Sequence, residues 1–474
     1  MKKTIISLAI AASLLSASSS ALAAGDTWSI VSPSGKVEAV HGVNPMEAAR
    51  QAINAYRKKG ILSIHATIDN EHHRIVLLSA KTKATGSLAE FVPAGGELNI
   101  NQLNRDLPLI RDYARAHGGD PVIHVGAITQ SGDLPIETDI APASTQTKGV
   151  VLSSFGPRYS GSDVISGFAS GSYDGWLYSS TATAGLPFLT PHESRGGYYY
   201  GFNGEGIRPF KYGEFVLGTN LSVYKEGGKL EPLDITGQSQ LFYTGIKRPY
   251  SWGTPGLRLE VGRQLSHIGI ADISGSQTYT ALRATYDLTK SFMLPRMKSP
   301  TVATVSAAVV QGLSVSTSGY GLGRINLDPN FTTALVDMTA NQNFGKWTAS
   351  LAAGGQVQRG VQPLQLDFYL GGANRGSGYF TGAASSPTGA YGGIRLYTPP
   401  FTIKGVTLRP FTGYNQSVGE PMIGHSLRAA SAEIGTQVSF GQNFAGDIGY
   451  ARITDHDGEH DTKGRLIFNI IAKF

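Results

Sequence analysis

The last eleven residues, "GRLIFNIIAKF" (Gly464–Phe474), decide the fold class. Every second residue is apolar, including Phe468 and Phe474, whereas Arg465 and Lys473 fall on the other face. A period of two is typical of a β-strand whose two faces meet different surroundings. The chain therefore ends in an amphipathic strand with an aromatic residue at its last position.

The same alternation recurs upstream, back to about residue 150. The segments "GLRLEVGRQ" (256–264), "LQLDFYL" (364–370) and "AASAEIGTQVSF" (429–440) each carry one apolar face and one face with Arg, Glu, Asp or Gln. A soluble β-sandwich shows similar alternation, so the alternation alone does not distinguish it from a membrane barrel. The number and length of the segments favour one of the two folds. About sixteen segments of about ten residues each predict a mainly β fold, a transmembrane antiparallel β-barrel of about 16 strands over residues 150–474.

The start of the chain predicts export from a bacterial cytoplasm. "MKK" is followed by the apolar run "TIISLAIAASLL" and by a small-residue cleavage site near Ala23 or Ala24. This pattern is typical of a removable signal peptide, here residues 1–24, since the apolar run is too short for a membrane helix. The chain has no cysteine, which excludes disulfides, thiolate metal sites and cysteine nucleophiles.

Residues 25–143 carry helical patterns instead of alternation. "NPMEAARQAINAYRKKG" (44–60) has an N-cap asparagine, a proline at the first helical position and a final glycine. The strands "ILSIHATI" and "RIVLLSA" follow. A second helix is expected in "INQLNRDLPLIRDYARAHGG", with a break or restart at Pro108, and then the strands "PVIHVGAI" and "DLPIETDI". We expect an abbreviated α/β module over residues 25–81, a second over 82–143, and a linker at 144–149.

The composition argues against several other classes of protein. Charged residues make up 16% of the chain, below the roughly 25% of soluble domains, and glycine numbers 60. The net charge of +6 is spread without a basic block, so no nucleic-acid partner is expected. After the signal peptide no apolar run reaches the length of a membrane helix.

The glycine-rich stretch "GGANRGSGYF" (371–380) is the first candidate for chemistry. Gly371 and Gly376 have the spacing of a phosphate-binding loop, but Ser377 and Gly378 stand where Lys and Ser/Thr belong. A strand pattern follows in place of a helix. We therefore expect no bound nucleotide, no other cofactor and no enzymatic activity, because no hydrolase motif occurs elsewhere.

A second candidate lies in "TDHDGEHDT" (454–462). His456 and His460 stand among several acidic residues, as in some metal sites. A solvated hairpin tip that turns at Asp457 and Gly458 explains the same residues, so no metal site is predicted. Acidic residues on polar strand faces, such as Glu260, are expected to solvate a water-filled interior.

The sequence resembles a family of secretion proteins in its overall order and in one loop. "LGGANRGSGYFTGAASSPTGAYGGIRLYTPP" (370–400), with five strands after it, is similar to the sixth extracellular loop of the outer-membrane transporters of two-partner secretion. These TpsB proteins are haemolysin-activator-like members of the BamA-type superfamily, which carry POTRA domains. "LNINQLNRDLPLIRDY" is similar to the last POTRA domain of that family, and the terminal strand resembles a signal for barrel assembly.

The resemblance implies a pore and a loop that folds into it. The implied residues of the pore and gating loop are Gly371, Gly372, Arg375, Ser377, Gly378 and Tyr379. Asn415 is the implied latch partner on the barrel wall, and the implied C-terminal assembly signal is Phe468, Ile470 and Phe474.

Two positions depart from the family pattern. The family's loop arginine aligns with Ser377, and its aspartate partner in a "PF-x-x-x-D-x-G" strand aligns with Asn415 in "RPFTGYNQSVG". Losing both charges together is tolerable, whereas one buried charge alone would be costly. Two hypotheses follow: Ser377, Tyr379 and Asn415 form a neutral latch, or Arg375 reaches an acidic residue elsewhere on the wall.

The implied function is export of a partner protein. A secreted TpsA-like exoprotein would meet POTRA-like modules in the periplasm and thread through the barrel without ATP, by type V secretion. The other implied partners are the outer-membrane assembly machinery and the lipid bilayer. The alternatives are an assembly or insertion factor of the same superfamily, and a passive porin or adhesin. About twenty residues precede Asn44 in the mature chain, so the family's N-terminal plug helix is expected to be absent.

Overall fold

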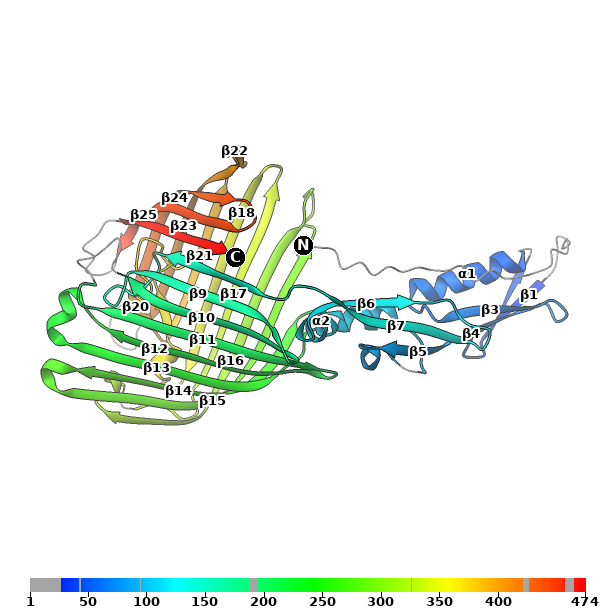
Figure 1. The fold of residues 1–474 in the computed structure, drawn as a ribbon, viewed down its shortest axis with the longest axis horizontal. Helices are drawn as coiled ribbons and strands as arrows, with labels where there is room; N and C mark the ends of the chain where they lie inside the picture. The colour runs from blue at the N-terminus through cyan, green and yellow to red at the C-terminus, as the bar shows by residue number, and fades with distance from the viewer. Residues whose placement is uncertain are drawn as a thin grey trace.

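Two small α/β modules lead into a closed β-barrel in the computed structural model (Figure 1). The structure describes residues 27–41, 44–93, 95–186, 194–324, 326–420, 426–456 and 464–474. The expected signal peptide lies outside these residues. Neither α-helix in the described part of the chain is long and apolar enough to cross a membrane.

The first module packs one helix on a four-stranded sheet. Its elements are β1 (Thr27–Val31), β2 (Val37–His41), α1 (Pro45–Lys58), β3 (Ile64–Asp69) and β4 (Arg74–Ser79), and the strand order is β2-β1-β4-β3. The side chain of Asn44 caps α1 by accepting from the backbone N–H of Met46 at 2.9 Å. The fully buried Trp28 and Ile75 lie under the helix. The sequence indicated β3 and β4 but not β1 and β2. These two strands are short, and few of their side chains are buried.

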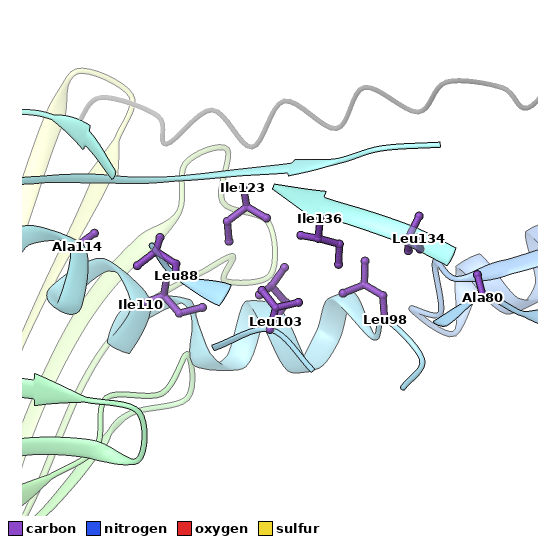
Figure 2. Close-up of a cluster of buried hydrophobic side chains, with 10 residues drawn as sticks. Ala80, Leu88, Leu98, Leu103, Ile110, Ala114, Ile123, Leu134 and Ile136 are labelled. Carbon is purple, nitrogen blue, oxygen red and sulfur yellow. The ribbon is translucent and has the colours of Figure 1, made fainter. Parts of the chain in front are cut away.

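The second module has a three-stranded sheet in the order β5-β7-β6. Its elements are β5 (Lys81–Gly86), the short 3-10 helix η1 (Ala89–Phe91), α2 (Ile100–Ala116), β6 (Gly119–Val125) and β7 (Asp133–Pro142). Figure 2 shows its core, in which Leu98, Leu103 and Ile110 face Ile123 and Ile136. The strand β5, parallel to β7, was not predicted.

The predicted break at Pro108 is wrong. The helix α2 continues through this proline from Ile100 to Ala116. A proline inside a helix removes one hydrogen bond and costs about 3 kcal/mol. Leu103, Leu109 and Ile110 on either side are buried, and their packing outweighs that cost.

Sixteen strands close the barrel in the described part of the chain, each antiparallel to its neighbours. In chain order they are β8 (Thr147–Ser153), β9 (Asp163–Tyr173), β10 (Trp176–Leu186), β11 (Tyr198–Phe210), β12 (Gly213–Lys225), β13 (Ile235–Lys247), β14 (Thr254–Ile268), β15 (Ile273–Phe292), β16 (Thr301–Gly319), β17 (Thr332–Phe344), β18 (Trp347–Arg359), β21 (Thr388–Tyr397), β23 (Val406–Glu420), β24 (Leu427–Phe440), β25 (Phe444–His456) and β26 (Gly464–Lys473). The short β22 (Phe401–Ile403) adds to β23 at one turn. The last strand, β26, pairs with β8, which begins inside the stretch predicted as a linker.

The alternation of the strands separates an apolar exterior from a polar interior. On β14 the exposed Leu257, Leu259 and Val261 point outward, while Glu260 between them is buried. The exterior is that of a barrel in contact with lipid, because apolar side chains exposed in this number would be unfavourable in water.

Exposed aromatic residues form a girdle at the end of the barrel where the modules lie, which we call the module end. They flank every strand-to-strand turn at this end and include the last residue of the chain. The girdle consists of Tyr173, Phe210, Tyr212, Phe215, Trp252, Phe292, Phe344, Trp347, Phe401, Phe440, Phe444 and Phe474. Aromatic girdles mark the interface between lipid tails and water in membrane barrels.

One segment predicted as a barrel strand has another structure. "LQLDFYL" (364–370) forms a 3-10 turn, η5 (Leu364–Leu366), followed by the three-residue strand β19 (Phe368–Leu370). β19 pairs with β20 (Ala384–Ser386) away from the barrel sheet. Its alternation reflects burial inside the molecule, since Phe368 and Leu370 are buried.

Candidate functional site: a loop folded into the barrel

The connection between β18 and β21, residues 360–387, crosses the barrel lumen; we call it the inward loop. The Gln365 Nε2 donates to Ser239 Oγ on β13 at 2.7 Å, and the backbone N–H of Gly378 donates to Ser431 Oγ on β24 at 2.9 Å. β13 and β24 are the sixth and fourteenth barrel strands, so these contacts lie on opposite walls of a sixteen-stranded barrel. The inward loop therefore occupies the interior from wall to wall.

The glycines of the predicted gating loop form a tight tip. Gly371, Gly372 and Gly376 have φ of +84°, +94° and +110°, a region in which side chains are strained. A Cβ at Gly371 would lie 2.2 Å from the carbonyl oxygen of Phe380. The tip closes through the backbone N–H of Gly371, which donates to the carbonyl of Arg375 at 2.9 Å. These glycines permit close backbone packing.

The structure brings Ser377 and Asn415 together. The Asn415 Oδ1 accepts from the backbone N–H groups of Gly376 and Ser377 at 2.8 and 2.6 Å, and its Nδ2 donates to Ser377 Oγ at 3.1 Å. Both side chains are buried. Neutral hydrogen bonds therefore stand at the positions where the family pattern has a charged pair.

Further contacts of the tip were not foreseen from the sequence. Ser417 Oγ donates to the carbonyl of Arg375 at 2.5 Å, and Tyr379 donates its hydroxyl to the backbone carbonyl of Asp455 on β25. Ser417 lies on the inward face of β23, as Asn415 does. Ser431 lies on the inward face of β24 and is the direct cross-strand partner of Asn415. The register between β23 and β24 places Ser431 opposite Asn415, so knowing this register would have identified Ser431.

Arg375 reaches an acidic residue on the barrel wall. One nitrogen of its guanidinium lies 3.5 Å from the carboxylate of Asp337 on β17, and its centre lies 4.5 and 4.7 Å from the rings of Phe368 and Tyr391. The Tyr391 hydroxyl donates to the same carboxylate at 2.7 Å. The structure thus contains neutral hydrogen bonds that join Ser377 to Asn415, with the Tyr379 hydroxyl bonded to the Asp455 carbonyl, and a charged contact between Arg375 and Asp337. Their roles in gating stay predictions.

A buried ion pair ties the inward loop to the loop before it. Arg324, in the connection between β16 and β17, donates to both carboxylate oxygens of Asp367 at 2.8 and 2.6 Å. The Asp367 side chain is fully buried, and Gln362 donates to it at 3.1 Å. Two parallel N–H···O bonds fix the orientation of both groups. This pair was not predicted from the sequence, because the two residues are 43 positions apart and no local pattern links them.

The wall around the inward loop carries paired charges. Arg395 contacts Glu433 at 2.6 Å and Asp447 at 3.0 Å. Glu260, expected to solvate a water-filled interior, is buried and accepts from Arg258 and Arg283, both at 2.6 Å. Such pairing balances the wall charges locally, although Oε2 of Glu260 and Oδ1 of Asp447 are buried with no hydrogen-bond partner among the described residues.

The second module docks on the barrel through α2. Arg248, in the turn between β13 and β14, contacts the carboxylate of Asp106 at 3.5 Å, and the backbone N–H of Ser251 donates to the carbonyl of Arg105 at 3.0 Å. The Tyr250 ring lies between the two arginines. Helix α2 is therefore held at the rim of the barrel, as Figure 1 shows.

The remaining predicted residues lie at the end of the chain. Phe468, Ile470 and Phe474 alternate along and beyond β26, and Phe474 is 69% exposed at the module end. Their role in assembly stays a prediction. In the described residues, no group of three or more His, Asp or Glu side chains is placed to hold a metal ion. The hairpin tip with Asp457, Gly458 and His460 lies outside those residues.

Comparison with known proteins rests on structure. No model of a protein family matches the sequence, and no curated protein matches it. Among solved structures, CdiB from Escherichia coli has a TM-score of 0.69 and 13% identity, with 97% of this chain and 93% of that chain covered. CdiB from Acinetobacter baumannii gives a TM-score of 0.64 at 13% identity and covers 93% of this chain and 83% of that one.

A third structure is similar over most of both chains. BamA from Haemophilus ducreyi, lacking POTRA domains 1–3, has a TM-score of 0.53 at 10% identity, with 90% of this chain and 93% of that chain covered. At these identities the likeness concerns the fold. The resemblance predicted from the sequence is confirmed at that level: the chain has the fold of the CdiB and BamA barrels, with two small α/β modules before sixteen strands.

Proposed function

We propose that this protein is an outer-membrane translocation pore that exports a partner exoprotein by two-partner secretion. Its two modules would stand in the periplasm and recognise the exoprotein, which then threads through the barrel without ATP. Folding of the exoprotein outside the cell would make its passage directional. The proposal concerns transport, with no covalent chemistry.

The observation that carries the proposal is a polar lumen crossed by a loop on separable contacts. The tip of the inward loop rests on neutral hydrogen bonds to Asn415, Ser417 and Ser431. Each such bond contributes only about 1 kcal/mol when water can replace it. The tip could therefore be displaced by a polar polypeptide at moderate cost once the Arg375–Asp337 contact opens, while the Arg324–Asp367 ion pair holds the loop at Asp367.

The modules offer edges where an extended segment could bind. β2 and β3 are the outer strands of the first sheet, and β5 and β6 those of the second. An added strand would gain main-chain hydrogen bonds at such an edge. Because α2 docks at the barrel rim, a segment held on the second module would lie beside the entrance to the lumen.

Coexpression with a candidate exoprotein, such as one encoded beside this gene if the genome carries one there, tests the proposal. We expect the exoprotein in the medium with the full chain, and its loss when residues 25–143 are deleted while the barrel still assembles. Persistent export after that deletion would refute the role of the modules. A defect in other barrel proteins would indicate an assembly factor, and steady conductance without effect on any exoprotein would indicate a porin.

A further inference from the structure

A cavity of about 760 Å³ lies where the end of α2 meets the barrel rim. Its lining comes from Tyr113 of α2, His117 directly after that helix, Glu90 of η1, the β9–β10 turn around Asp174, and residues 208–211 at the end of β11 and in the turn after it. Arg208 and Phe210 belong to the outward face of β11, in phase with the exposed Phe202. The cavity therefore lies at the rim itself, with Tyr173, Arg208 and Phe210 on its lipid side and with Ser172 and Pro209, from the inward faces of β9 and β11, on its other side.

A second cavity shows that α2 straddles the rim. This one, of about 450 Å³, is lined by Asp112 and Arg115 of α2 and by Leu177, Ser179 and Glu205 on the inward faces of β10 and β11. The same helix therefore contacts the lumen on one side and the lipid-facing surface on the other. The larger cavity presents Tyr173, Arg208 and Phe210 on the lipid-facing side of the rim.

The height of the larger cavity matches the headgroup layer. Tyr173, which is 79% exposed, and Phe210 line it and belong to the aromatic girdle. Tyr212 follows directly in the next turn. Because aromatic girdles lie at the level of lipid headgroups, the cavity opens where phosphates and amines of the bilayer are found.

The cavity carries two cations and two anions that are not paired with one another. Arg208 and Lys211 are exposed, as are Glu90 and Asp174, and among the described residues none of the four forms an ion pair. The Arg208 guanidinium lies over the Trp176 ring at 5.8 Å, which fixes it at the rim. Separate positive and negative groups around one cavity suit a ligand with both charges.

Two stacked rings complete the lining on the module side. The rings of Tyr113 and His117 stack with their centroids 4.3 Å apart and their planes 30° apart, and burial followed by the Glu90 charge raises the pKa of the Tyr113 hydroxyl. An aromatic face next to a carboxylate is a favourable environment for an ammonium group.

We propose that this cavity binds the headgroup of a zwitterionic ethanolamine phospholipid from the leaflet at the module end. Arg208 and Lys211 contact the phosphate through charge-assisted hydrogen bonds, and Glu90 and Asp174 contact the ammonium. The lipid would join the second module to the barrel from the membrane side. This inference needs a membrane-embedded barrel but is independent of export.

Native mass spectrometry of the full chain in detergent tests the site, with phosphatidylethanolamine and phosphatidylglycerol as probes. We expect tight binding of phosphatidylethanolamine, weakened about tenfold in Arg208→Gln/Lys211→Gln. The matched control is Lys346→Gln/Lys404→Gln, which removes two exposed lysines from other turns at the module end, beside girdle aromatics but away from this cavity. The control is expected to bind as the unaltered protein does.

A second pair of variants separates the zwitterionic lipid from an anionic one. Glu90→Gln/Asp174→Asn removes the ammonium contacts and should abolish the preference for phosphatidylethanolamine over phosphatidylglycerol. Equal binding by the Arg208/Lys211 variant and the control would overturn the site. A preference for phosphatidylglycerol in the unaltered protein would overturn the zwitterionic assignment. These lipid-binding measurements do not involve export, so a negative result would leave the proposed function unaffected.

Discussion

Asn415 holds the tip of the inward loop through both ends of its amide. Its oxygen accepts two backbone N–H groups and its nitrogen donates to Ser377, all in a buried setting. An aspartate would keep the acceptor but would bring a buried charge that the neutral Ser377 cannot balance. The two neutral residues therefore form a consistent set.

Replacing Asn415 with leucine should release the tip. Two buried N–H groups would lose their acceptor, at about 1–3 kcal/mol each. We expect the open fraction of single pores in planar bilayers to rise about tenfold or more. Asn341→Leu is the control, since Asn341 is an exposed asparagine on the inward face of β17. Equal gating of the two variants would contradict a latch at Asn415.

In the Arg324–Asp367 pair each buried charge needs its partner. Removing one of the two residues should therefore destabilise the inward loop more than removing both. Arg324→Leu leaves Asp367 buried and is expected to cost about 3–5 kcal/mol in the free energy of unfolding. Arg324→Leu/Asp367→Leu should cost less than that single change. Urea unfolding of the barrel in vesicles measures both. Lys225→Ala, which breaks the exposed Lys225–Asp234 pair, should change the free energy of unfolding far less than Arg324→Leu does, because water screens such a pair. A double variant worse than the single would refute this account.

At the scale of elements, α2 is the joint between module and barrel. Burial against the rim raises the pKa of the Asp112 carboxyl, and Glu214, Lys247, Arg111 and Arg115 surround it. Because the docked state favours the protonated acid, docking is strongest below the ordinary pKa of 3.8 and weakens as pH rises through the raised value.

Docking of the second module should therefore loosen with rising pH, and Asp112→Asn should suppress much of that change. The chain has no cysteine, so spin labels can be placed at Glu97→Cys and Lys346→Cys without background. We expect the distance distribution between the labels to broaden from pH 4 to pH 8 in the unaltered protein and much less in Asp112→Asn. Identical broadening in both proteins would assign the effect to other groups.

At the scale of the whole molecule, the barrel presents three different surfaces. Its exterior is apolar with an aromatic girdle, its wall carries paired charges such as Arg395 with Glu433, and its lumen contains the inward loop. The loop contacts both β13 and β24, so it restricts the lumen across its full width. If the barrel acts as a pore, as proposed above, we expect its opening to require displacement of this segment.

Replacing residues 362–386 with a short Gly-Ser linker should give a permanently open pore. The crossing segment and its side chains would leave the lumen, and conductance in planar bilayers should increase severalfold. Deletion of residues 295–298, in the β15–β16 turn at the module end, is the control and should leave conductance unchanged. Unchanged conductance after loop replacement would show that another segment restricts the pore.

Much of the fold follows from local patterns in the sequence. Alternation such as that of Leu257, Leu259 and Val261 arises because each strand has a lipid side and a lumen side, so barrel class and inside–outside assignment were predictable. The cap at Asn44 likewise marked α1. The predictions of a helix break at Pro108 and of a barrel strand at residues 364–370 are wrong. In both places burial in the tertiary structure outweighed the local preference of the sequence.

The barrel, the preceding helices and the aligned pair Ser377 and Asn415 could be predicted from the amino-acid sequence, because they depend on periodicity and on one motif. The folded chain was needed to see that Arg375 contacts Asp337, that Arg324 holds Asp367, and that α2 straddles the rim. Those contacts join residues from distant strands and loops, and their partners are set by the closure of the sheet. No local pattern encodes which side chains that closure brings together.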